Sequence, residues 1–138
     1  MTDDKTFIAE FEACRWPLEK WHHRDHIKLA YLYLTQYSLE DTLDRIRSGI
    51  QAHNATHQVP DSLTSGYHET MTYAWLRLVQ FVMQEYGNSA NADQFYDDHP
   101  ELSQKKIIRL FYSPERFMSP DAKVKRCEPD LTSFPASR

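Results

Sequence analysis

The sequence predicts an all-α protein, a single domain over residues 1–138 arranged as a bundle of about five to six helices with an extended C-terminal tail. Only 3 glycines occur in 138 residues, which is few for a protein built from many hairpins. Apolar residues recur at helical spacing, and no segment shows the alternation of a confident strand. A chain of this length buries about two-thirds of its unfolded surface, so a hydrophobic core is enough to fold it.

Proline and capping residues divide the N-terminal half into three predicted helices. The first covers residues 3–15. Pro17 ends it, because the residue before a proline avoids the helical region, and Pro17 suits the first position of the next helix. This second helix is expected to run to about residue 37, and the histidines near its start mark a place where it can break. Ser38 is expected to cap a third helix over 39–57.

The C-terminal half is predicted to contain a loop, one long helix and shorter elements. Residues 58–66 hold proline, aspartate, serine and glycine, which are typical of a loop. A fourth helix is expected over about 66–86, followed by shorter helices at 90–98 and 101–112. Residues 113–138 are predicted to be mostly irregular, with one or two helical turns and then an extended segment lying across the bundle.

Composition and charge argue against several function classes. The formal net charge is −4, and basic residues are scattered apart from 123–126, so we expect no nucleic-acid partner. No apolar run reaches the length of a membrane span, so we expect no membrane partner. The acidic N-terminal segment has no signal-peptide core, which favours a cytoplasmic location. Cys14 and Cys127 are expected to be free thiols.

The main candidate for chemistry is the histidine-rich segment WHHRDH at residues 21–26. His23 and His26 are three residues apart, and His22 and His26 are four apart, so each pair shares a helix face. His26 is the strongest candidate because it belongs to both pairs, and His22 is expected to be a spectator. The alternative is that all three are simply the polar start of a helix.

His68 connects this segment to the predicted fourth helix. Short connections make successive helices antiparallel, so the second and fourth helices should run parallel, with their histidines at one level. His23, His26 and His68 are therefore predicted to bind a transition metal such as zinc, iron, copper or nickel, with an open coordination position. The helix dipole at an N-terminus favours neutral imidazole, which a metal ligand requires.

Glu69 follows His68 directly, and three roles stay open for it. It is a fourth metal ligand, a catalytic base acting on a metal-bound water, or a first-turn glutamate stabilised by the helix dipole. The last role is slightly favoured. The segment HETMT is not the zinc-protease motif, because Thr72 stands where the second histidine would be.

The remaining histidines and the aromatic residues are weaker candidates. His53 and His57 are four residues apart and are expected at a solvated helix end, with metal binding as the alternative. His99 is expected to be exposed. Most tyrosines and tryptophans are assigned to the core, and the alternative is that a subset lines a small-molecule pocket.

Four segments together resemble a known family: WHHRDHI (21–27), SGYHET (65–70), YSPER (112–116) and EPDL (128–131). The family consists of small, all-helical, uncharacterised bacterial proteins, and the likeness covers about residues 7–135. Its Trp-x-His-x-x-His pattern falls on Trp21, His23 and His26, and its second segment falls on residues 67–70. The resemblance implies His23, His26 and His68 as the site, and it implies no substrate or reaction.

Three functional hypotheses follow. The sequence leans toward a metal-dependent enzyme or metal-binding protein with the three-histidine site. The second hypothesis is a non-catalytic helical module that binds a small molecule or a protein partner, with a homodimer left open. The third is a metal-free enzyme that uses a histidine and a glutamate as an acid–base pair.

Overall fold

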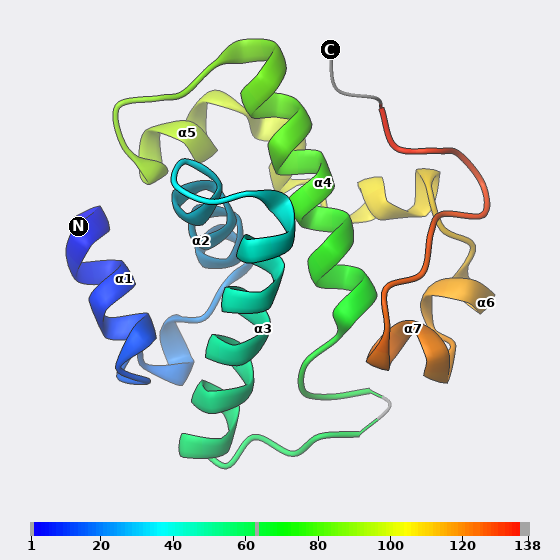
Figure 1. The fold of residues 1–138 in the computed structure, drawn as a ribbon, viewed down its shortest axis with the longest axis horizontal. Coiled ribbons are helices and arrows are strands. Elements are labelled where there is room, and N and C mark those ends of the chain that lie inside the picture. The colour runs from blue at the N-terminus through cyan, green and yellow to red at the C-terminus, as the bar shows by residue number, and fades with distance from the viewer. Residues whose placement is uncertain (1, 63, 136–138) are drawn as a thin grey trace.

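A computed structural model describes residues 2–62 and 64–135, and these residues form an all-α bundle without a strand (Figure 1). The prediction of an all-helical fold is confirmed. The long helix α4 stands between the N-terminal helices and the C-terminal segments. The α-helices are α1 (Asp4–Glu12), α2 (His23–Leu34), α3 (Leu39–Thr56), α4 (Glu69–Tyr86), α5 (Ala92–Asp98), α6 (Pro114–Phe117) and α7 (Pro120–Val124), and the 3₁₀ helices are η1 (Leu18–Lys20), η2 (Pro100–Ser103) and η3 (Lys105–Leu110).

The first and third helices begin at capping residues, whereas α4 begins at Glu69, three residues later than expected. The Asp3 carboxylate accepts the Thr6 amide at 2.7 Å, and the Ser38 hydroxyl accepts the Asp41 amide at 3.2 Å. The break expected near the histidines is also present. After η1 the chain is extended at Trp21 and His22, so α2 starts at His23.

The predicted helix over 101–112 is instead split into η2 and η3, with Gln104 extended between them. The His23 imidazole takes the Leu102 carbonyl as its hydrogen-bond acceptor at 2.7 Å. A continuous α-helix would give that carbonyl to the amide of residue 106. A tertiary contact therefore replaces a helical one at this point.

The extended C-terminal segment lies across the bundle, as predicted. Phe134 is buried, and its ring lies 4.9 Å from that of Phe111 and 5.9 Å from that of Tyr73. The Leu131 amide donates to the Phe111 carbonyl at 2.9 Å. One apolar core thus extends from Phe7 in α1 to this segment, and the last three residues of the predicted tail lie outside the described part.

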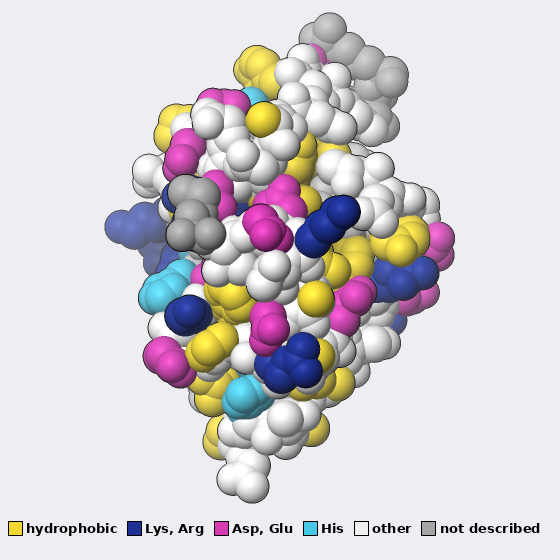
Figure 2. All heavy atoms as spheres, turned by 90° about the vertical axis from the view of Figure 1, so that its left-hand side faces the viewer, with side chains coloured by type: hydrophobic (Ala, Val, Ile, Leu, Met, Phe, Trp, Pro, Cys, Tyr) yellow, Lys and Arg dark blue, Asp and Glu magenta, His cyan; other side chains and the backbone are white. Residues whose placement is uncertain are grey.

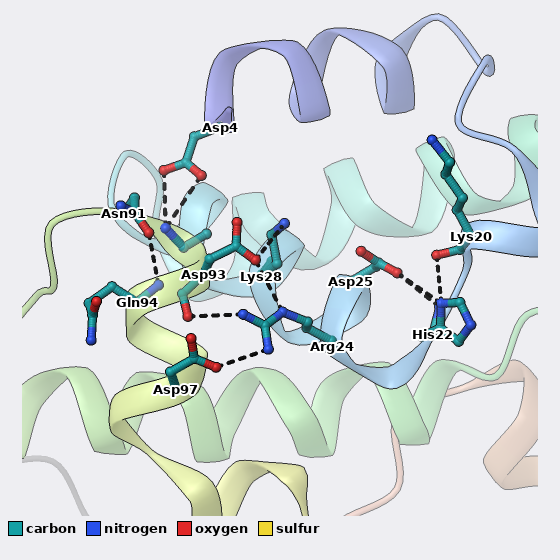
Figure 3. Close-up of polar contacts among 11 residues, drawn as sticks. Asp4, Lys20, His22, Arg24, Asp25, Lys28, Asn91, Asp93, Gln94 and Asp97 are labelled. Atoms are coloured by element: carbon teal, nitrogen blue, oxygen red, sulfur yellow. Dashed lines mark hydrogen bonds and ion pairs between the residues drawn. The ribbon is translucent and has the colours of Figure 1, made fainter. Parts of the chain in front are cut away.

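The start of α2 is attached to α5 by ion pairs (Figure 3). Arg24 lies between two carboxylates of α5, with its Nε 3.1 Å from Asp93 and its Nη1 2.9 Å from Asp97. The buried Lys28 ammonium lies 3.2 Å from the same Asp93 oxygen. These contacts hold the helix turn that carries His23 and His26.

Charges are mixed on the surface. On the face drawn in Figure 2, Lys and Arg side chains stand among Asp and Glu side chains rather than in one basic patch. Of the helices in the described ranges, none combines the length and apolar character that a membrane crossing needs.

Candidate functional site

Two adjoining cavities open beside the N-terminal ends of α2 and α4. The inner cavity has a volume of about 200 Å³ and the outer one about 1050 Å³. His23, His26, Met71 and Trp75 line both cavities. His68 lines the inner cavity, so the structure brings the three predicted histidines to one hollow.

His26 forms part of the wall that the two cavities share. Its ring stacks on the Trp21 ring with centroids 4.8 Å apart, and the side chain is still accessible to water from the cavities. Neither ring nitrogen forms a hydrogen bond with another described residue. The surrounding protein, together with the nearby His23 and Lys105, lowers the pKa of His26 to about 4. At neutral pH its imidazole is therefore uncharged, with one donor and one acceptor available.

His23 has one nitrogen committed to the fold. Because a carbonyl oxygen only accepts, the His23 Nε2 carries a proton and donates it to Leu102, which leaves the Nδ1 lone pair unused in that contact. The ring meets Trp75 edge-on at 4.6 Å. Burial, and to a smaller extent Lys105, lowers the pKa of His23, although the Leu102 hydrogen bond opposes this. His23 is thus also neutral at neutral pH.

His68 has both nitrogens committed. As the N-cap of α4, its Nδ1 accepts the Met71 amide at 3.0 Å, and its Nε2 donates to the Phe117 carbonyl at 3.1 Å. Its ring also stacks on Phe117 at 4.9 Å. In this arrangement His68 caps α4 and ties α6 to it, and it has no free lone pair to offer a metal. The three-histidine metal set does not fit these contacts.

Glu69 is separated from the histidine cavities. Its two oxygens accept hydrogen bonds from Arg47 at 2.9 and 2.6 Å, and the Tyr67 hydroxyl donates to it at 2.7 Å. Burial alone would raise the pKa of Glu69, but these hydrogen bonds outweigh it and lower the pKa. Glu69 lines another cavity, of about 440 Å³, beside α3. These contacts agree best with the first-turn role.

Metal-ligand groups are absent from the part of the chain that the structure describes. Within residues 2–62 and 64–135, no three His, Cys, Asp or Glu side chains are grouped so that they could hold a metal ion. Of the three predicted ligands, His23 and His26 keep a lone pair that no hydrogen bond among the described residues uses.

Two expectations about the other histidines are wrong. His53 is fully buried, and its Nε2 lies 2.6 Å from the Trp16 carbonyl, while His57 Nε2 donates to the Cys14 carbonyl at 2.9 Å. Both contact the connection after α1, where His53 is buried, whereas His57 stays partly exposed at the end of α3. His99, expected to be exposed, is buried against aromatic rings of Phe95 and Tyr86.

Sequence reasoning missed the residues that complete the cavity walls. Trp75 lies seven residues after His68 and lines the inner cavity, whereas the sequence assigns most tryptophans to the core. Lys105 and Arg109 line the outer cavity from η3. No signal in the sequence could place them there, because that segment resembles an ordinary amphipathic helix.

Comparisons of this chain with protein-family models, with curated proteins and with solved structures gave no match. The resemblance to small helical bacterial proteins therefore stays a prediction.

Proposed function

We propose that this protein binds a small organic molecule in the two cavities, with the His26 imidazole as the central polar recognition group. The observation that carries the proposal is the state of His26: it lines both cavities, is accessible from them, and has no hydrogen-bond partner among the described residues. An unpaired imidazole on a cavity wall is therefore suited to a ligand that supplies the partner.

The walls around His26 support this function. Aromatic side chains from several segments line the outer cavity, with a few polar groups between them. Ligand pockets are typically concave and mostly apolar, with few polar groups that fix orientation. The aromatic members are Trp21, Trp75, Tyr96, Tyr112 and Phe117.

The geometry gives less support to a histidine–glutamate acid–base pair. Glu69 contacts Arg47 and Tyr67 and lines a different cavity from His26. A carboxylate with a lowered pKa and occupied oxygens is a weak base. Ligand binding does not require this pair.

The tryptophans provide a direct test. The chain has 3 tryptophans, and Trp21 and Trp75 line the cavities whereas Trp16 lines neither. In a fragment screen followed by ¹H–¹⁵N spectra, cavity ligands should shift the indole signals of Trp21 and Trp75 and leave that of Trp16 in place. His26→Leu should weaken binding of the polar fragments among these hits, because it removes their hydrogen-bond partner. The absence of any hit with this pattern would contradict the proposal.

A metal at His23 and His26 is the second candidate function. It is favoured by one observation: the His23 Nε2 donates to a backbone carbonyl, as metal-ligating histidines commonly do with their other nitrogen. Elemental analysis of untagged protein tests it. Near-stoichiometric transition metal that is lost in His26→Ala would support a metal centre. Metal-free protein whose melting temperature does not change when a chelator is added would rule it out.

A further inference from the structure

The outer cavity differs in charge from the chain as a whole. The chain has 20 acidic and 16 basic residues. The residues that line the outer cavity nevertheless include Arg24, Lys105 and Arg109, together with three histidines, and no aspartate or glutamate. The outer cavity of this acidic protein therefore has a positive wall without carboxylates.

Two of these cations are unpaired. Arg24 is neutralised by Asp93 and Asp97 of α5. Other basic residues are paired in the same way, such as Arg47 with Glu69 and Arg126 with Glu40. Lys105 and Arg109 form no ion pair with any residue of the described ranges.

The charge of Lys105 acts inside the cavity. Burial is the main cause of the lowered pKa of both His23 and His26, and the charge of Lys105 adds to it for each. No carboxylate lines the cavity to oppose it. A cleft that carries positive charge and no opposing carboxylate attracts anions.

The aromatic walls indicate the shape of the uncharged part of a ligand. Trp21 stacks on His26, Trp75 meets His23 edge-on, and the Arg24 guanidinium lies over the Tyr96 ring. Flat ring surfaces of this kind favour a flat apolar partner.

We infer that the ligand is a small organic anion with a flat apolar body, whose anionic group is bound by Lys105 and Arg109 at the cavity edge. The inference rests on the proposed function, and it deepens it by naming the chemical class of the ligand. The apolar body lies against Trp21 and Trp75, and His26 supplies the inner hydrogen bond.

Two fluorescent probes that differ mainly in charge test the inference. 8-Anilinonaphthalene-1-sulfonate is anionic, and N-phenyl-1-naphthylamine is its uncharged counterpart. At low salt, Lys105→Gln and Arg109→Gln should each weaken binding of the anionic probe about three- to tenfold, since each removes one charge-assisted contact. Binding of the uncharged probe should change less than about twofold. Added salt should weaken binding of the anionic probe more for the native protein than for Lys105→Gln.

Lys106→Gln is the matched control, because Lys106 lies on the same helix but lines neither cavity. It should leave both affinities unchanged, and near-UV circular dichroism should show that all variants are folded. The anion inference is wrong if Lys105→Gln and Lys106→Gln weaken binding of the anionic probe equally, or if neither weakens it. In that case, binding of the uncharged probe would still support the proposed function. If neither probe binds the native protein, both are overturned.

Discussion

Two histidines at the starts of two helices differ because of their neighbours. His68 caps α4 and donates to Phe117, so both of its nitrogens serve the fold. His26 lies three residues into α2 and has no such partners, so both of its nitrogens face a ligand or water. The role of each imidazole therefore depends on which hydrogen-bond donors and acceptors from other segments lie next to it.

At the residue scale, His26 should make stability depend on pH. Its pKa is about 4 in the folded protein and near 6.5 in the unfolded chain. The unfolded chain therefore binds more protons between these values, so the contribution of His26 to the free energy of unfolding is full above pH 6.5 and is lost as the pH falls toward 4. His23, His53 and His68, with lowered pKa values, act in the same direction.

Urea unfolding of the native protein and His26→Gln, measured from pH 4 to pH 7.5, tests this dependence. The native protein should lose more stability than the variant over the lower part of this range, since only the native protein has a neutral imidazole to protonate at this position. Parallel curves for the two proteins would show that His26 titrates normally.

A second residue-scale prediction concerns Glu69. Glu69→Gln should lower the free energy of unfolding by about 1–3 kcal/mol, because it weakens the pairing of the partly buried Arg47. Affinity of the histidine cavities for a neutral probe should not change. Asp44→Asn is the control, since Asp44 pairs with the same arginine but its side chain is 69% exposed. A loss of cavity binding in Glu69→Gln without a loss of stability would instead favour a catalytic or ligand role.

At the scale of elements, α1 and α3 pack closely at a glycine. A Cβ atom at Gly49 would lie 2.4 Å from the Cζ atom of the Phe11 ring. That ring is 1% exposed and edge-on to Trp21, so it has little room to move. The glycine lets the two helices approach.

Gly49→Ala should therefore destabilise the protein by about 1–3 kcal/mol, although alanine favours helix by about 1 kcal/mol over glycine. Ser48→Ala is the matched control, because Ser48 is exposed on the same helix and its substitution adds no contact. Thermal unfolding compares the two variants. A Gly49→Ala protein as stable as Ser48→Ala would mean that α1 shifts without cost.

At the scale of the whole molecule, the C-terminal segment completes the core. Thr70 of α4 donates its hydroxyl to the Lys125 carbonyl at 2.8 Å and accepts the Cys127 amide at 3.1 Å. Phe134 then covers Tyr73 and Phe111. The segment thereby closes α4 against solvent on the side opposite to α1.

Phe134→Ala should lower the free energy of unfolding by about 3 kcal/mol, the cost of removing a buried aromatic side chain. Leu131→Ala, at a side chain that is 57% exposed, should change it by less than about 0.5 kcal/mol. Denaturant titration measures both. Equal effects of the two substitutions would show that the segment contributes no specific packing.

The predictable part of the fold lies in local signals. Asp3 and Ser38 form short-range capping bonds, so their helices could be placed from sequence. The helix expected over 101–112 could not be corrected from sequence, because His23 reaches Leu102 across 79 positions. The site was predictable in part. Helix order predicts that His23, His26 and His68 lie near one another, but it does not predict their hydrogen bonds.

The sequence by itself determined an all-helical chain and the helix starts at which three histidines meet, because helix caps and apolar periodicity act over a few residues. Tertiary structure decided which histidine is free. Phe117 and Leu102 supply the carbonyls that occupy His68 and His23, and η3 brings Lys105 to the cavity that His26 lines. These partners are distant in sequence, and only the packing of the whole chain brings them together.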